Sequence, residues 1–297
     1  MSPLPRLVAF DLDDTLAPSK SPVEPRMLEV FARLLARTNV AVISGGNFEQ
    51  FESQLLTRLA DAAAASRAAG SAEDAATGDA AAGDAAAGDA ATERAVAAAG
   101  SASSASVIDE TALSRLHLLP TCGTRYERRE HGAWATVYRE HLSEVERDSA
   151  LIALREEAAR LGLWESEPWG EILEDRGSQV TFSALGQRAP VAAKHAWDPD
   201  GVKKNALRAA VAARLPELEV RSGGSTSVDI TRRGIDKAYG MRKLEEHTGI
   251  SLDEMLFVGD RLDPDGNDYP VLALGVTCHA VTGWEDTVAF LDELLRH

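Results

Sequence analysis

The arrangement of apolar and polar residues predicts strands and helices that follow one another along much of the chain. Residues 7–10 are all apolar, which is typical of a short buried strand. Leu28, Phe31 and Leu35 then recur at intervals of three and four residues, which predicts an amphipathic helix over residues 23–37. The same criteria predict strands over residues 39–46, 116–123, 255–260 and 271–281, and helices over residues 47–60, 235–249 and 284–297. Strands that alternate with helices predict an α/β fold built on a mostly parallel, doubly wound, Rossmann-like sheet.

Residues 125–230 follow a different pattern, in which paired strands accompany helices. Strands are expected over residues 132–140, 171–176, 178–185, 218–222 and 226–231, and helices over residues 143–162 and 200–215. This pattern predicts a separate α+β unit that is inserted into the first domain as a cap over the active site. We therefore expect a first core segment at 1–124, a cap domain at 125–230 and a second core segment at 231–297.

Residues 61–110 are of low complexity. They consist mostly of Ala, Gly, Asp and Ser, and a GDAAA unit returns every five residues. A five-residue period matches neither a helix nor a strand, and glycines destabilise helices. We expect a disordered surface insertion without a specific function, with an interaction arm as the alternative.

Composition restricts the classes of partner. The net charge of −16, from 47 acidic and 31 basic residues, argues against binding to nucleic acid or to anionic membrane, and favours small ligands and metal cations. The sequence reaches an acidic cluster before a signal-peptide core could form, and no run of about 18 apolar residues follows. A cytoplasmic protein is therefore expected, and its oligomeric state does not follow from the sequence.

An acidic cluster directly follows the first predicted strand. Asp11, Asp13 and Asp14 occupy three of four consecutive positions there, and a divalent cation is a simple way to balance carboxylates that lie so close together. In an open α/β sheet the carboxyl ends of the strands meet at the crevice where ligands bind. The other residues expected at this crevice are Ser44, Lys237, Asp260, Asp263, Asp265 and Asp268.

These residue types suit phosphoryl transfer. Asp11 could attack phosphorus and form an aspartyl phosphate, and Asp13, two residues on, could protonate the leaving oxygen and later activate water. Mg²⁺ prefers oxygen ligands, which Asp11, Asp260 and the backbone near Asp13 could provide. Lys237 would offset negative charge and Ser44 would hold a phosphate oxygen. Each feature alone also fits a surface loop, a calcium-like site or a solvated lysine, but their joint order favours catalysis.

With these motifs, the sequence resembles the haloacid dehalogenase superfamily. The resemblance implies a Rossmann-like core, Mg²⁺ as cofactor, Asp11 as nucleophile and Asp13 as acid/base. It also implies that Ser44 and Lys237 are catalytic and that Asp260 binds the metal. Asp268 would support the metal site, and Asp13 is also expected among the metal-binding residues.

Within that superfamily the sequence is similar to the α-phosphomannomutase family, which has an α/β cap of the IIB type, also called C2B. The similar segments are SGGNFEQF, RSGGSTSVDITRRGIDK and GDRLDPDGND, and they imply that Ser227 and Asp229 contact sugar hydroxyls. A polar strand face toward solvent is the alternative for these two residues. The nucleophile loop departs from the family pattern D-x-D-G-T, because Asp14 stands in place of the glycine.

The cap departs from the family in its phosphate grip. Three arginines of the family correspond here to Arg176, Gln187 and Lys194, with Arg188 beside the second position, and a solvated cap surface is the alternative for Arg176 and Lys194. A mutase must hold a bisphosphate at both ends, and Gln lacks the bidentate fork of Arg. We therefore expect a phosphatase that acts on a sugar phosphate or a similar small phosphorylated metabolite. A phosphomannomutase-type isomerase is the alternative, followed by a non-catalytic sugar-phosphate sensor.

Overall fold

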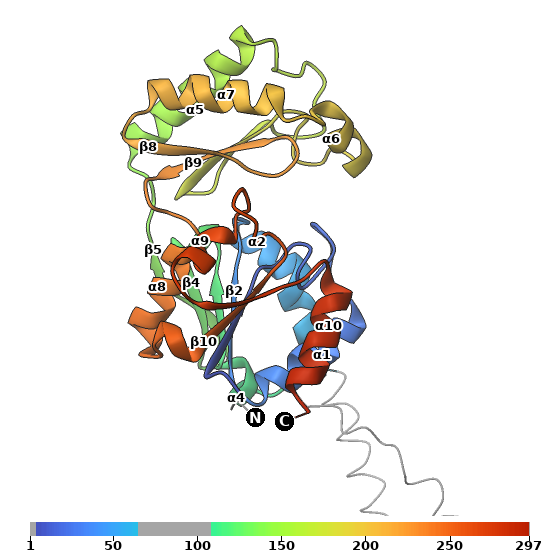
Figure 1. The fold of residues 1–297 in the computed structure, drawn as a ribbon. Helices are drawn as coiled ribbons and strands as arrows, with labels where there is room; N and C mark the ends of the chain where they lie inside the picture. Colours follow the sequence, from blue (N-terminus) through green and yellow to red (C-terminus); the bar gives the residue numbers. More distant parts are fainter. Residues whose placement is uncertain (1–3, 65–107, 297) are drawn as a thin grey trace, which may run out of the picture.

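A seven-stranded sheet forms the core of the protein. The computed structural model describes residues 4–64 and 108–296 (Figure 1). The order of the strands is β11-β10-β1-β2-β3-β4-β5, of which the first five are parallel and β4 and β5 are antiparallel additions at one edge. Their bounds are β1 Leu7–Phe10, β2 Asn39–Ile43, β3 Leu116–Leu119, β4 Arg125–Glu130, β5 Ala133–Arg139, β10 Met255–Gly259 and β11 Thr277–Ala280.

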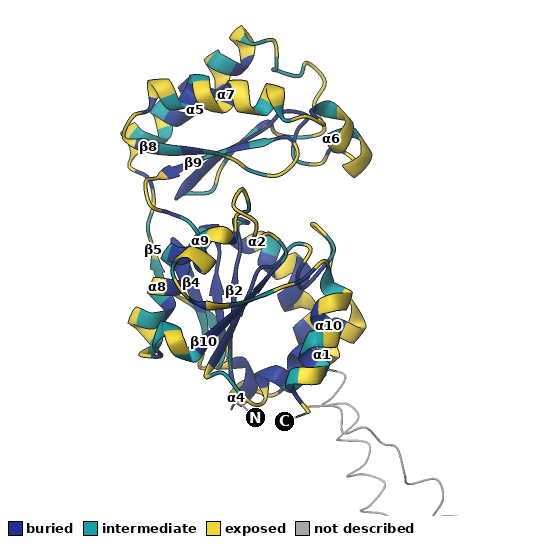
Figure 2. Ribbon diagram, in the orientation of Figure 1, coloured by how far each residue is buried: buried dark blue, intermediate teal, exposed yellow. Residues whose placement is uncertain are grey.

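Helices cover both faces of this sheet, and the alternation of side chains along each strand explains why. In β1, Val8 and Phe10 join one apolar cluster, whereas Leu7 and Ala9 join another. The first cluster includes residues of α1 Pro25–Leu35, α2 Phe48–Phe51, the π-helical turn η1 Glu52–Leu56, α4 Glu110–Leu113 and α10 Trp284–Leu294. The second includes residues of α8 Lys237–Thr248 and α9 Tyr269–Ala273. Figure 2 shows these helices exposed on their outer sides and buried toward the sheet.

A second unit, residues 144–232, has its own sheet and core. Its four strands, in the antiparallel order β6-β7-β9-β8, are β6 Leu173–Asp175, β7 Gln179–Ser183, β9 Ser227–Arg232 and β8 Leu218–Ser222. Two helices, α5 Glu144–Arg160 and α7 Val202–Arg214, lie on one face of this sheet (Figure 1), and α6 Val191–Trp197 lies beside it. Phe182 and Leu154 are fully buried between the sheet and these helices.

The predicted α/β class with a doubly wound parallel sheet is confirmed. Two differences from the prediction affect the core sheet. The strand expected over 271–281 is shorter, because residues 269–273 form α9 and only 277–280 pair with β10. Residues 125–139 were expected in the cap, but their backbone pairs with β3 and so extends the core sheet. We propose a domain boundary after residue 139, and the C2B type of the cap stays a prediction.

The carboxyl ends of the parallel strands point toward the four-stranded sheet of the second unit (Figure 1). Two chain connections, from β5 to α5 and from β9 to α8, join the two units. Most of the predicted low-complexity insertion, residues 65–107, lies outside the described residues. In the described part of the chain, no helix combines the length and the apolar character that a membrane span needs.

The core of the second unit can be tested on a single helix, α5. Leu154 is fully buried, and we expect Leu154→Ala to lower the free energy of unfolding by about 2–5 kcal/mol, because it removes apolar contacts and leaves a cavity. Ile152→Ala is the control, since 52% of Ile152 is exposed, and its expected change is within about 0.5 kcal/mol. Urea unfolding measures both. Equal losses in the two variants would contradict the described packing of α5.

Candidate active site

The ammonium group of Lys237 lies between two buried carboxylates. Its Nζ atom is 2.7 Å from Asp11 Oδ1 and 2.5 Å from Asp268 Oδ1, and the side chain is only 1% exposed. Asp11 directly follows β1, Asp268 precedes α9, and Lys237 is the first residue of α8. The carboxylate of Asp236 accepts a hydrogen bond from the backbone N–H of Tyr239, which caps α8 and fixes where Lys237 stands. The structure thus brings together residues that are 257 positions apart in the sequence, 11 and 268.

Asp260 completes the group. Oxygen atoms of Asp11, Asp260 and Asp268 lie within 4.8 Å of one another. Burial raises the pKa of Asp11; Lys237 opposes this, and the neighbouring carboxylates of Asp268 and Asp260 add to it. Burial also raises the pKa of Asp260, and Asp268 adds to that rise. For Lys237 burial alone would lower the pKa, but Asp11 and Asp268 outweigh it and the pKa is raised.

The donor set fits a hard divalent cation. Three carboxylates and one ammonium group leave two negative charges, which one Mg²⁺ would balance, and all the available side-chain donors are oxygen atoms. A second carboxylate contact supports the arrangement: Asp268 Oδ2 accepts a hydrogen bond of 3.1 Å from the backbone N–H of Arg261, which holds Asp268 in place.

Asp13 lies outside this group of carboxylates. Its Oδ1 accepts hydrogen bonds from the backbone N–H of Lys20 at 2.7 Å and from Gln54 Nε2 at 3.1 Å, and its Oδ2 accepts one from Gln50 Nε2 at 2.9 Å. Gln54 belongs to the π-helical turn η1, which directly follows α2. We predicted Asp13 as a metal ligand, but its side chain is turned toward these three donors. Any share of Asp13 in a metal site would therefore come from its backbone.

Asp14 takes the place of the family's glycine without disturbing the loop. Its φ angle is 57°, in the left-handed region that glycine adopts freely and that Asp tolerates. Asp14 Oδ1 accepts a hydrogen bond of 3.0 Å from the backbone N–H of Ser19, and the N–H of Asp14 donates to the carbonyl of Ala17. The backbone conformation that a glycine would supply is thus kept by a side chain that bonds locally.

Ser44 is buried at the end of β2, in the loop that leads to α2. Its hydroxyl accepts a hydrogen bond of 3.1 Å from the backbone N–H of Gly46, and only 4% of the residue is exposed. The backbone N–H of Cys122 donates to the carbonyl of Ser44, and the N–H of Thr121 donates to that of Gly46. The segment after β3 therefore holds the Ser44 loop in place.

Arg176 joins the second unit to this loop. Its Nη1 donates to the carbonyl of Gly45 at 2.9 Å, and its Nη2 pairs with Glu174 at 2.9 Å. Asn47 Nδ2 donates to the other oxygen of Glu174, also at 2.9 Å. Arg176 is half-buried, so the solvated surface that we kept as an alternative does not describe it.

Ser227 and Asp229 lie on β9 of the second unit and pair with β7. Asp229 Oδ1 accepts a hydrogen bond of 2.8 Å from Thr181. Burial raises the pKa of Asp229, and the positive charges of Arg176 and Lys20 oppose this rise. Asp229 and Arg176 are therefore close enough to interact, although Arg176 stands in the turn between β6 and β7.

One cation of the site, Lys20, was not predictable from the sequence. Its side chain belongs to the core loop after Asp13, yet it lies near the cap residue Lys194: burial lowers the pKa of Lys194, and the neighbouring Lys20 lowers it further. Lys194 Nζ also donates to the carbonyl of Gln187 at 3.1 Å. Two ammonium groups, one from each unit, are thus close enough to repel each other. A lysine in a polar loop has no periodicity or motif that could have revealed this.

The two remaining cap residues differ in their surroundings. Gln187 is half-buried, and its Nε2 is buried without a hydrogen-bond partner among the described residues. Arg188 is exposed, and its side chain lies against Gly170. Gln187 therefore has an unused N–H donor and a backbone carbonyl that contacts Lys194, whereas the side chain of Arg188 lies against Gly170.

Comparison with known proteins gives a partial family match. The family model described as eukaryotic phosphomannomutase matches residues 169–297. The phosphomannomutase of Spinacia oleracea is 30% identical over 133 residues, 42% of this chain and 51% of that protein, and the one of Drosophila melanogaster is 36% identical over 81 residues, 27% and 31% of the two chains. The chain thus spans about half, or less, of the length of the curated relatives it matches. The matched residues 169–297 include Lys237, Asp260 and Asp268, but not Asp11 or Asp13.

Solved structures match over almost the whole chain, and at 12–13% identity they show the fold alone. The IMP-nucleotidase of Plasmodium falciparum superimposes with a TM-score of 0.65, covering 99% of this chain and 63% of that chain. A trehalose-6-phosphate phosphatase of Aspergillus fumigatus superimposes with a TM-score of 0.51, covering 99% and 93%. The chain therefore has the fold of the haloacid dehalogenase superfamily and is phosphomannomutase-like over residues 169–297.

Proposed function

We propose that the protein is a Mg²⁺-dependent phosphohydrolase that acts on a sugar phosphate or a similar small phosphorylated metabolite through an aspartyl-phosphate intermediate. The observation that carries this proposal is the buried contact of Lys237 with Asp11 and Asp268. The ammonium group holds Asp11 Oδ1, and Oδ2 has no hydrogen-bond partner among the described residues, which leaves it available as the attacking atom. Lys237 also balances charge as the anionic carboxylate approaches an anionic phosphate.

The other core residues supply proton transfer and orientation. Asp13 protonates the oxygen of the leaving sugar, and in the second step it takes a proton from the water that cleaves the phosphate from Asp11. Gln50, Gln54 and the backbone of Lys20 position the Asp13 carboxylate for this role. Ser44 donates its hydroxyl proton to a phosphate oxygen, since the hydroxyl oxygen already accepts from Gly46.

Asp11, Asp260 and the backbone at Asp13 would hold Mg²⁺, with Asp268 in support. When bound, the cation supplies charge neutralisation between the carboxylates and the phosphate. A cytoplasmic location and the absence of nucleic-acid and membrane partners belong to the same proposal.

The second unit would bind the rest of the substrate. Ser227 and Asp229 suit sugar hydroxyls, because Asp229 is a half-buried acceptor. Lys20 and Lys194 repel each other, and an anionic group between them would relieve that repulsion. Arg176 contributes a third positive charge near Asp229.

Hydrolysis is favoured over isomerisation because the grip on a second phosphate is weak. Gln187 has a neutral amide where the family has a guanidinium, and Arg188 is directed away toward Gly170. The mutase stays the second candidate, since Lys20 and Lys194 offer two cations of their own. A non-catalytic sensor has little use for Lys237 held between two carboxylates.

We expect Mg²⁺ to raise the thermal midpoint, because it binds the native carboxylate group and not the unfolded chain. Asp260→Asn should weaken Mg²⁺ binding at least about tenfold in a titration followed by the thermal midpoint. Asp263→Asn is the matched control, because Asp263 is exposed and pairs with Arg261. The affinity of this variant for Mg²⁺ should equal that of the wild type. A thermal midpoint that does not change with Mg²⁺, or equal losses of Mg²⁺ affinity in the two variants, would refute the proposed metal site.

The nucleophile has a direct test. Asp11→Asn should lower phosphate release from mannose 1-phosphate with Mg²⁺ at least about 10³-fold, because an amide is a poor nucleophile. Asp14→Asn should stay near the wild-type rate, because Asn tolerates a φ angle of 57° and can accept the Ser19 hydrogen bond. ³¹P NMR measures both rates, and the thermal midpoint shows whether each variant is folded. A folded Asp11→Asn variant with near-native turnover would exclude Asp11 as the nucleophile.

The choice between phosphatase and mutase rests on Gln187. With mannose 1-phosphate, Mg²⁺ and a trace of hexose bisphosphate, we expect the wild type to release inorganic phosphate, and Gln187→Arg to raise the ratio of 6-phosphate to inorganic phosphate about tenfold, the scale of a hydrogen bond to a charged group. Gln187→Leu is the control for shape and should not raise it. A 6-phosphate signal that dominates in the wild type would establish the mutase instead.

A further inference from the structure

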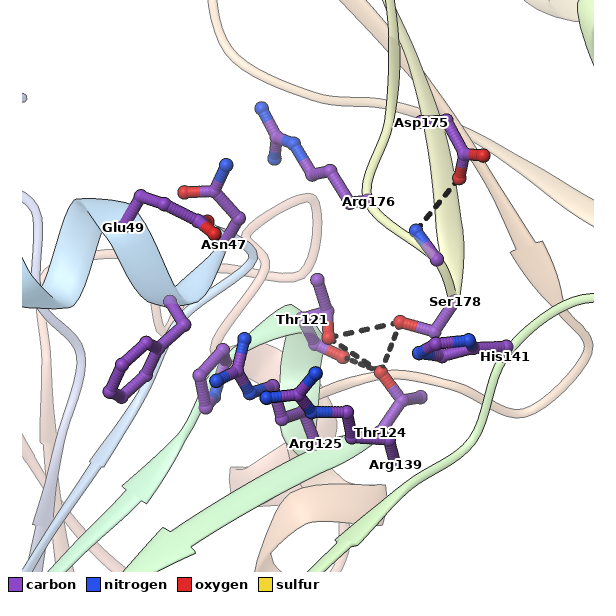
Figure 3. A pocket seen from close by; sticks show the side chains of 13 residues that line it. Asn47, Glu49, Thr121, Thr124, Arg125, Arg139, His141, Asp175, Arg176 and Ser178 are labelled. Carbon is purple, nitrogen blue, oxygen red and sulfur yellow. Dashed lines mark hydrogen bonds between the residues drawn. The ribbon is translucent and has the colours of Figure 1, made fainter. Parts of the chain in front are cut away.

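A cavity of about 290 Å³ lies between the core and the second unit. Figure 3 shows its walls: Asn47 and Glu49 come from the segment after β2, Arg125 and Arg139 from the β4–β5 hairpin, and Arg176 and Ser178 from the β6–β7 turn. None of the core residues in the proposed reaction lines it. The cavity is therefore separate from the carboxylate group around Lys237, and it shares only Arg176 with the proposed substrate site.

Two guanidinium groups are held at one side of this cavity. Arg125 lies over the ring of Phe48, with its Cζ atom 4.1 Å from the ring centroid, and its Nε is 2.5 Å from Glu127 Oε1. Arg139 shares the same carboxylate at 3.6 Å. Among the described residues, both Nη atoms of Arg125 have no hydrogen-bond partner, and they are not buried. Figure 3 shows the two guanidinium groups close together, so unused N–H donors gather at one place.

Charge is distributed unevenly between the interior and the rim. The side chains of Arg125 and Arg176 are only 19% and 12% exposed. The acids of the lining, Glu49 and Asp175, are both exposed, and Asp175 accepts a hydrogen bond from the backbone N–H of Gly177. The single carboxylate of Glu127 serves two arginines, which leaves one positive charge in excess at that wall. An anion inside the cavity would thus meet guanidinium groups first.

The floor of the cavity ties the two units together. Ser178 of the second unit and Thr121 and Thr124 of the core form a buried cluster of hydroxyl groups, with oxygen–oxygen distances of 2.5, 2.6 and 3.0 Å (Figure 3). Arg176 reaches from the same turn to the carbonyl of Gly45, next to Ser44. A ligand in the cavity would therefore contact both units, and it would contact Arg176, whose side chain holds the Ser44 loop.

We propose that this cavity is a second binding site, distinct from the catalytic one, for a small phosphate-bearing anion. Guanidinium groups with free, forked N–H donors suit phosphate oxygens, which accept two parallel hydrogen bonds. The volume lies at the lower end of the range of ligand pockets, which restricts the ligand to a small molecule. Because its walls come from both units, the bound anion favours the arrangement in which Arg125 and Arg176 face the same space.

Inorganic phosphate is the probe, titrated by calorimetry into the full chain with EDTA present. Without a divalent cation the carboxylates around Lys237 repel phosphate, so the catalytic centre does not contribute and no turnover is needed. The Arg125 and Arg139 variants distinguish the cavity from binding at Lys20 and Lys194. We expect one phosphate per chain, and at least about tenfold weaker binding for Arg125→Gln. The control is Arg129→Gln, since Arg129 stands on the same strand and pairs with Glu110, outside the cavity. Its affinity should equal that of the wild type.

The outcomes are separable from those of the proposed function. Arg125→Gln removes a partner of the buried Glu127, so its fold is checked by circular dichroism, and Arg139→Gln, which keeps the Arg125–Glu127 pair, is measured beside it. Weaker binding in a folded Arg125→Gln or Arg139→Gln variant, with Arg129→Gln unchanged, supports the site. No phosphate binding in EDTA, or equal binding by all folded variants, overturns it, even if the enzyme hydrolyses its substrate normally.

Discussion

The buried ion group of Lys237, Asp11 and Asp268 constrains the rest of the structure. An ammonium group that is 1% exposed is tolerated only when carboxylates surround it, and removing one partner of such a group costs about 3–5 kcal/mol. The partners come from opposite ends of the sequence, so the group forms only when β1 and β10 lie side by side, as their parallel register places them. The pairing of β1 with β10 is therefore also a condition for forming the ion group of the site.

The site nevertheless has more negative charge than this pairing requires. Two carboxylates would suffice to pair Lys237, yet Asp260 is a third, and burial together with its neighbours raises its pKa. A fold selected only for stability would gain from an apolar side chain there. Residual negative charge in a half-buried position favours the binding of a cation, and this supports the proposed phosphoryl transfer at this end of the sheet.

Much of the core was predictable because burial imposes a simple pattern. Residues 7–10 are apolar at every position since β1 is buried on both faces, and the order of strand, carboxylate and helix then places Asp11, Ser44, Lys237 and Asp260 at one edge. The hairpin β4–β5 escaped prediction as a core element, because half of its surface faces solvent and its residues 125–130 are mostly charged. In α9, a five-residue helix, the apolar run 271–274 resembles a strand as closely as a helix.

The parts of the site that the sequence did not reveal depend on contacts between segments that are distant in the sequence. Gln50 and Gln54 reach Asp13 from the end of α2 and the π-helical turn that follows it, and a π-helical turn has no sequence signature. Lys20 can be recognised as a residue of the site only because it lies near Lys194, which belongs to the second unit.

Such contacts matter most in a chain with a net charge of −16, whose overall field repels a phosphate ester. A ligand of that kind can bind only where cations outnumber acids locally, and in the described residues Arg176 and Lys20 lie near Asp229, with Lys194 beside Lys20. Each comes from a different segment, so these positive charges lie close together only after the core and the second unit are assembled. In the proposed function, recognition of a phosphorylated ligand therefore depends on both units together and not on either one alone.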